Sequence, residues 1–162
     1  MNQLKIEIKW AVIFTVVALL WMLLEKLTGL HDTHINLHLY LTNLFAIPAI
    51  IVMIKALIDK KNNFYNGKMS YKQGLISGVV LSIFIALLSP LAQWVTTYVI
   101  TPEYFFNVIE YSVETGYYKT VSEAEAFFNY KNYAIQGAFF SLVMGIVTTT
   151  IAMIFIKTKP NH

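Results

Sequence analysis

The sequence predicts an all-α fold: an integral membrane four-helix bundle with an extracytoplasmic amphipathic helical hairpin between spans 3 and 4. The chain of 162 residues is 57% hydrophobic and only 13% charged, whereas roughly a quarter of the residues in a typical soluble domain are charged. The apolar residues form long runs, which is the pattern of membrane spans. A helix from Ser70 to Ile100 would be about 45 Å long, and no side chain after Lys72 in it is charged. We therefore predict a single membrane domain over residues 1–162.

The composition excludes several classes of function. The chain has no cysteine, so disulfides, thiolate catalysis and cysteine-based metal sites are ruled out. Its 12 basic residues are all lysines, which lack the planar fork that binds phosphates and carboxylates in pairs. These lysines lie beside the apolar runs and are not interleaved with stacking aromatics, so the net charge of +3 does not predict nucleic-acid binding. The expected partner is the lipid bilayer, and no cofactor is predicted.

The first span is predicted over residues 10–27. The residues that close it, Glu25-Lys26-Leu27-Thr28-Gly29, do not form a small-residue cleavage site, so we expect a retained span rather than a secretory signal. We expect Glu25 to lie at the membrane interface, paired with its neighbour Lys26. A role in a pathway for protons or ions is the alternative.

Three of the four histidines follow in a short turn. Asp32 or Thr33 is expected to cap the second helix, on which His34 and His38 would share one face because they are four residues apart. With Asp32 or His31, these two histidines could form a nitrogen and oxygen site for zinc or another divalent ion. The simpler interpretation is that amphipathic imidazoles lie in the headgroup layer, and the HExxH pattern of zinc hydrolases is absent.

The second span is predicted over residues 39–57, with a kink at Pro48, which removes one backbone donor. A polar, lysine-rich loop follows, with a turn at Asn66-Gly67. Ser70 and Gln73 are spaced as a capping box for the third helix.

The third span (residues 74–100) and the fourth (133–156) each carry a stripe of small residues at four-residue spacing, which allows close helix packing. The stripes are Gly74, Gly78 and Ser82 on the third span, and Gly137, Ser141 and Gly145 on the fourth. In antiparallel helices they would overlap near Ser82 and Gly145. We expect packing within one chain, with homodimerisation through the remaining stripe residues as the alternative.

The outer half of the third span has a polar side. Ser89-Pro90 is expected to bend the helix, and Gln93, Thr96 and Thr97 follow it. These three residues are candidates for lining a polar cavity.

The segment 101–132 is predicted to form two interfacial helices, over about residues 102–115 and 123–131. Thr101 is the expected cap of the first helix, and Gly116 its expected stop. Ser122 and Glu125 fit the capping-box pattern at the start of the second.

The distribution of lysines predicts the topology. Nine lysines lie at the termini and in the middle loop, and three lie in the other two loops. The positive-inside rule therefore places both termini on the cytoplasmic side of a bacterial inner membrane, with the His-rich turn and the hairpin outside.

Four segments of the sequence are specific enough to support a family resemblance: IEIKW (residues 6–10), WMLLEK (21–26), TNLFAIP (42–48) and NFYNGKMSYKQG (63–74). With Ser89-Pro90, Tyr104-Phe105 and residues 133–137, the chain resembles the bacterial domain-of-unknown-function 4199 family. The resemblance covers nearly the whole length and implies a small four-span membrane protein. It implies no activity, ligand or catalytic residue.

The sequence favours one function and leaves one alternative open. The favoured function is that of a non-enzymatic membrane protein that acts by association, as an accessory subunit or a homo-oligomer, on the basis of its small-residue stripes. The alternative is a small-solute or ion transporter with a site near the kinked spans 2 and 3, because broken helices often line transport sites. An enzyme is not predicted, because no nucleophile, base and oxyanion donor can be assigned together.

Overall fold

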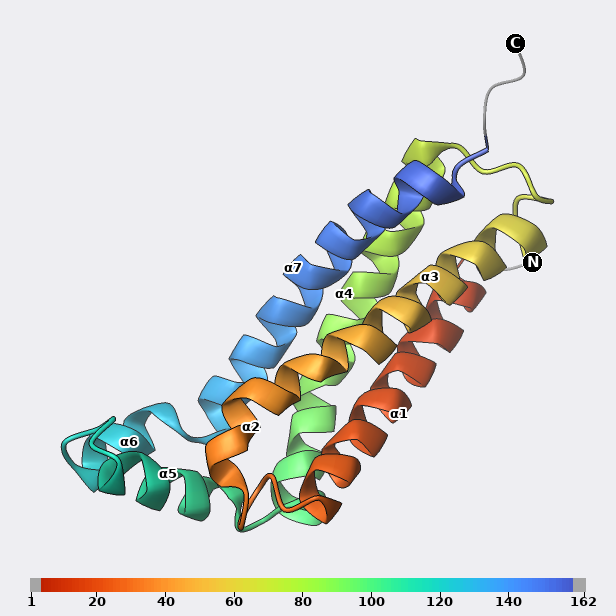
Figure 1. The fold of residues 1–162 in the computed structure, drawn as a ribbon. Coiled ribbons are helices and arrows are strands. Elements are labelled where there is room, and N and C mark those ends of the chain that lie inside the picture. Colours follow the sequence, from red (N-terminus) through yellow and green to blue (C-terminus); the bar gives the residue numbers. More distant parts are fainter. Residues whose placement is uncertain (1–3, 159–162) are drawn as a thin grey trace.

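The computed structural model describes residues 4–158, and its regular elements are all helices (Figure 1). Four helical stretches are long and apolar enough to cross a membrane: Lys5–Leu27, Ile35–Asn63, Tyr71–Ile100 and Val121–Ile156. The prediction of an all-α bundle with four spans is therefore confirmed. The elements, in order, are α1 (Lys5–Leu27), α2 (Ile35–Leu41), η1 (Thr42–Phe45), α3 (Ala46–Asn63), α4 (Tyr71–Val95), η2 (Thr96–Ile100), α5 (Tyr104–Glu114), α6 (Val121–Phe127) and α7 (Tyr130–Ile156).

The two ends of the bundle are formed by different elements. The start of α1, the end of α7 and the loop between α3 and α4 lie together at one end, whereas α5 and α6 lie across the other (Figure 1). We call the second the α5–α6 end. Helix α4 packs against both α1 and α7, and α3 packs against α1.

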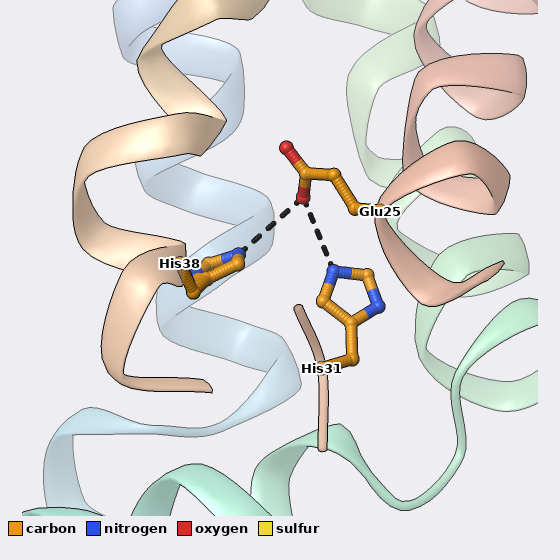
Figure 2. Close-up of side chains that lie close together, drawn as sticks. All are labelled: Glu25, His31 and His38. Carbon is orange, nitrogen blue, oxygen red and sulfur yellow. Dashed lines mark hydrogen bonds and ion pairs between the residues drawn. The ribbon is translucent and has the colours of Figure 1, made fainter. Parts of the chain in front are cut away.

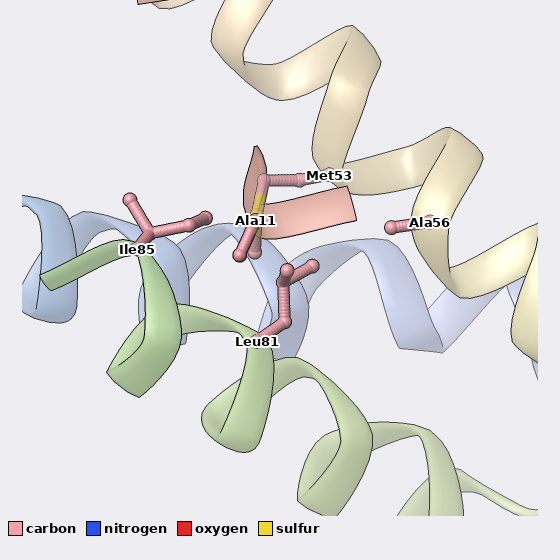
Figure 3. Packing of buried hydrophobic residues seen from close by; sticks show 5 residues of the cluster. All are labelled: Ala11, Met53, Ala56, Leu81 and Ile85. Atoms are coloured by element: carbon pink, nitrogen blue, oxygen red, sulfur yellow. The ribbon is translucent and has the colours of Figure 1, made fainter. Parts of the chain in front are cut away.

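The apolar core has two clusters. One consists of Leu57, Met69, Ala152 and Met153 and lies between α3, α7 and the loop before α4. The other lies between α1, α3 and α4. Figure 3 shows its buried side chains, which are Ala11, Met53, Ala56, Leu81 and Ile85. Many large apolar side chains face outward instead, such as Leu20, Leu87 and Phe155. An outward apolar surface is unfavourable in water but matches the acyl chains of a bilayer, so burial against lipid replaces much of the core.

Helices α4 and α7 are antiparallel and pack through the small residues of both predicted stripes. A Cβ atom at Gly78 would overlap Thr149, and one at Gly145 would overlap Ser82. Ser82 and Thr149 are fully buried. Further along the same contact, Gly74 lies against Met153, and Gly137 lies against Ser89. The glycines on these stripes are therefore covered within one chain.

The second span differs from the prediction because it is irregular before Pro48. The chain forms the 3-10 turn η1 between α2 and α3, and Leu44, four residues before the proline, lies in it. Pro48 has no N–H to donate to the Leu44 carbonyl, and its ring lies too close to that carbonyl in a regular helix. The irregularity therefore falls one turn before Pro48.

The third span starts as predicted and ends differently. Ser70 and Gln73 form the expected capping box, and the Asn66-Gly67 turn has positive φ at both residues. Helix α4 continues through Pro90. It ends in the π-helical turn η2, in which the N–H of Thr101 donates to the carbonyl of Thr96 at 2.9 Å.

Two predicted caps in the segment 101–132 are wrong. Helix α5 begins at Tyr104 after Glu103, and Thr101 makes no side-chain cap. The cap of α6 is Thr120 rather than Ser122. Asn129 has an extended backbone and accepts the N–H of Asn132, which starts α7 at Tyr130 and separates it from α6. The stop at Gly116 is confirmed by its positive φ of 74°.

Candidate functional site

Three ionisable side chains meet inside the α5–α6 end of the bundle. Oε2 of Glu25 lies 3.1 Å from Nε2 of His31 and 3.4 Å from Nε2 of His38. Figure 2 shows both imidazoles directed at the same carboxylate oxygen. One potential ligand atom from each residue lies within 4.8 Å of the other two. We call these three residues the Glu25 cluster.

The turn after α1 explains why His31 returns to Glu25. Gly29 has a φ of 78°, its N–H donates to the carbonyl of Lys26, and the N–H of Leu30 donates to the carbonyl of Glu25. This is the Schellman arrangement, which ends a helix and reverses the chain. A Cβ atom at position 29 would also overlap Thr33, so glycine is required there both for φ and for space.

The cluster is buried and held by surrounding aromatic residues. Glu25 and His31 are 1% and 4% exposed, and Nε1 of Trp21 donates to Oε1 of Glu25 at 2.5 Å. The hydroxyl of Tyr104 lies 3.5 Å from Nδ1 of His38 and 3.3 Å from the hydroxyl of Tyr133. Burial raises the pKa of Tyr104 above its usual range, because the phenolate would lose its hydration.

One ring nitrogen of the Glu25 cluster is unpaired among the described residues. Nδ1 of His31 is buried and has no hydrogen-bond partner among the described residues. Buried polar atoms are usually paired, so this atom calls for a ligand or solvent partner from outside the chain.

A pocket with a volume of about 120 Å³ lies beside the two histidines. Apolar groups, including Met22 and Phe105, form much of its wall, and we call it the polar pocket after the polar side chains that converge on it. Its polar lining comes from separate elements and consists of His31, His38, Thr42, Gln93, Thr96, Thr97, Thr101, Tyr104 and Tyr133. Pockets for drug-sized ligands are about 300–1,000 Å³, so this pocket suits an ion or a molecule of few atoms.

The three residues predicted to line a cavity all lie on the wall of this polar pocket. Thr96 and Thr97 are buried in η2, and Nε2 of Gln93 donates to Oγ1 of Thr97 at 3.0 Å. The π-helical turn brings the two threonines to the pocket in succession. Turns of this type often occur at functional sites.

The residues predicted as metal ligands are only partly brought together. His38 belongs to the Glu25 cluster, but His34 precedes α2, so its ring does not share a helical face with His38. Nδ1 of His34 lies 3.1 Å from the carbonyl of Thr28. Asp32 is exposed and accepts the backbone N–H of Thr33, which holds the pKa of Asp32 below its usual range. The predicted helix cap by Asp32 or Thr33 is not formed.

Sequence reasoning missed Glu25 as a partner of the histidines. The expected pairing of Glu25 with Lys26 is wrong, because Nζ of Lys26 donates to the carbonyl of Ile100. The available signal was Gly29, whose place after the helix predicts a reversal of the chain toward the last helical turn.

A second buried polar group lies at the opposite end and forms a closed network. Nζ of Lys60 lies 2.8 Å from Oε1 of Glu7, which also accepts the hydroxyl of Ser77 at 2.6 Å. The positive and negative charges compensate each other there. The Glu25 cluster differs, because it adjoins a pocket and leaves a ring nitrogen unpaired.

Chemically, the cluster offers two imidazole nitrogens and one carboxylate oxygen. This donor set can hold protons, or it can bind zinc and similar divalent ions.

Comparison with known proteins gives one result. A family model described as "Protein of unknown function (DUF4199)" matches residues 9–158. The searches of curated proteins and of solved structures gave no significant match.

Proposed function

The chain belongs to the DUF4199 family of proteins of unknown function, and we propose that this integral membrane protein binds an ion or a small polar solute non-enzymatically in its polar pocket. The observation that carries the proposal is the pocket itself, in which polar side chains from separate spans converge at one end of the bundle. Polar groups within membrane proteins commonly mark ion and solute pathways.

Irregular backbone on two spans supports a binding role. Thr42 belongs to η1, whereas Thr96 and Thr97 belong to η2, and all three line the pocket. Interrupted helices offer backbone and hydroxyl groups to ligands at sites where a regular helix would use them internally. This supports the transporter alternative, with a site between spans 2 and 3.

The lysine distribution supports an orientation. The end opposite α5 and α6 is formed by the start of α1, the end of α7 and the α3–α4 loop (Figure 1). The lysines counted for this end in the topology are Lys5 and Lys9 in α1, Lys55, Lys60 and Lys61 in α3, Lys68 in the loop, Lys72 in α4 and Lys157 after α7. Lys159, also counted, lies outside the described residues. By the positive-inside rule, that end and both termini are cytoplasmic, and the pocket opens toward the outer side of a bacterial inner membrane. Reporter fusions after residue 158 and within 115–120 would test this. Cytoplasmic activity at both positions would contradict it.

Two serine hydroxyls are used within their own helices. The hydroxyls of Ser112 and Ser141 donate to carbonyls of their own helices, so these serines are engaged in local bonds and not with a histidine base.

Association as an accessory subunit or a homo-oligomer stays a prediction with less support than ligand binding. It was inferred from the small-residue stripes, and α4 and α7 cover Gly74, Gly78 and Gly145 within one chain.

Ligand-dependent stability tests the proposal. We expect at least one member of a panel of alkali cations, divalent cations and glycine to raise the unfolding midpoint of the detergent-purified protein with increasing concentration. Gln93→Leu should abolish this rise. Thr150→Val is the matched control, because the Thr150 hydroxyl is exposed and bonds only its own helix. A flat response of the wild type, or an unchanged rise in Gln93→Leu, would refute the proposal.

A further inference from the structure

We infer that Glu25, His31 and His38 form a binding site for one divalent transition-metal ion of the zinc class, with its open coordination position facing the polar pocket. The inference deepens the proposed function, because the two histidines form part of the pocket wall. The ion would be held by the chain, and a small solute in the pocket could complete its coordination.

The distances between the donor atoms fit such an ion. Zinc lies about 2.0–2.2 Å from nitrogen and oxygen ligands, so two ligands in a tetrahedral site are about 3.3–3.6 Å apart. Oε2 of Glu25 is 3.1 Å and 3.4 Å from the two Nε2 atoms. The three donor atoms lie within 4.8 Å of one another. The three donor atoms are therefore already grouped at close to the spacing that a single ion requires.

The surrounding contacts leave the inward-facing atoms free for an ion. Trp21 bonds Oε1 of Glu25, which leaves Oε2 facing the histidines (Figure 2). On His38, Nδ1 faces the Tyr104 hydroxyl. Metal-ligating histidines commonly donate their second N–H to an oxygen in this way, which fixes the ring and its tautomer.

The second ring nitrogen of His31 requires an outer partner. Nδ1 is buried and has no hydrogen-bond partner among the described residues, so with Nε2 on the ion we expect this N–H to donate to a water molecule, a usual outer partner of a metal-ligating histidine. The side chain of Asn107 holds the backbone carbonyl of His31 at 2.9 Å. The ring is therefore positioned from its backbone, with Nε2 directed at Glu25.

The donor set selects the class of ion. Calcium and magnesium prefer all-oxygen ligands, whereas two imidazoles with one carboxylate suit zinc and neighbouring first-row ions. Three protein ligands leave one tetrahedral position open. The adjacent pocket holds only water or a molecule of few atoms at that position.

Zinc titration of the metal-stripped, detergent-purified full chain tests the inference, with a chromophoric chelator as competitor. We expect one zinc ion per chain. Removal of a ligand by Glu25→Gln or His38→Ala should weaken binding by more than the roughly 10–100-fold that loss of an outer-shell partner produces. His34→Ala is the matched control, because His34 lies in the same turn outside the cluster. The zinc affinity of this variant should equal that of the wild type.

Cobalt(II) provides a second measurement that does not depend on activity. The wild type should show the visible spectrum of a tetrahedral cobalt site, and His38→Gln should lose it while keeping its helical circular dichroism. No zinc binding by the wild type, or equal weakening in His34→Ala, would overturn the inference.

The zinc inference and the proposed function can fail separately. If Gln93→Leu keeps zinc and no other member of the ligand panel stabilises the wild type, the cluster is a metal site without a solute pocket. If a solute stabilises the wild type and zinc does not bind, the pocket stands and the metal inference falls.

Discussion

Glu7 and Lys60 form an ion pair of 2.8 Å between α1 and α3, and their side chains are only 4% and 2% exposed. Replacing Lys60 with Met would leave the carboxylate buried without its counter-charge, which typically destabilises by about 3–5 kcal/mol. We expect a loss of this size in the free energy of unfolding, measured by denaturant titration in mixed micelles.

The double variant Glu7→Met/Lys60→Met should recover most of that loss, because no buried charge is left. Lys9→Met serves as the control. Lys9 pairs with Asp59 but is 53% exposed, so its replacement should change the unfolding free energy by less than about 1 kcal/mol. Equal losses of unfolding free energy in Lys60→Met and Lys9→Met would contradict a buried ion pair between Glu7 and Lys60.

Gly78→Ala should destabilise the bundle by about 1–3 kcal/mol, because the added Cβ atom overlaps Thr149 across the α4–α7 contact. Thr149→Ala in the same chain should restore part of the loss by making room. The unfolding midpoints of the two single variants and the double variant give the coupling energy between the positions. Strict additivity would show that the two residues are not in contact.

Gly29→Ala should lower both stability and zinc affinity. The residue has positive φ, and its Cβ atom would overlap Thr33, next to the turn that carries His31. Gly67→Ala is the matched control, because Gly67 also has positive φ but nothing lies within 4 Å of its added atom. Both variants should lose about 1 kcal/mol from backbone strain, and only Gly29→Ala should lose zinc affinity in the chelator competition assay.

Alkaline pH should destabilise the protein through Tyr104. Burial raises the folded-state pKa of this phenol above that of the unfolded chain. Its contribution to stability is therefore complete below the unfolded pKa of about 10 and falls as pH rises above it. Unfolding midpoints measured between about pH 8 and 11 should fall less steeply for Tyr104→Phe than for the wild type. Tyr117→Phe, at an exposed position, should follow the wild-type curve.

The spans and their main contact could be predicted from the sequence, because membrane spans depend on long apolar runs and close packing depends on small residues. Ser82 and Gly145 meet as the antiparallel arrangement required. Local signals with one dominant cause, such as the Ser70 capping box and the stop at Gly116, were also predictable.

The composition of the Glu25 cluster was not predictable from helical spacing. The i and i+4 argument assumed that His34 already lies in the helix, but α2 begins at Ile35. The left-handed conformation of Gly29 brings His31 to Glu25. Tyr104 contacts His38 from α5, which lies far along the chain. Such contacts depend on tertiary packing, which a local pattern does not specify.

The two buried polar groups differ in how much chain must be synthesised before they can form. Glu25 and His31 are only six residues apart, so they can meet as soon as α1 and its following turn have formed, with a small loop-closure entropy. Glu7 and Lys60 are 53 residues apart, and their pairing requires the whole second span to return. During insertion from the ribosome, the Glu25–His31 contact can thus form before the Glu7–Lys60 pair, whereas the rest of the α5–α6 end must wait for α5 and α6.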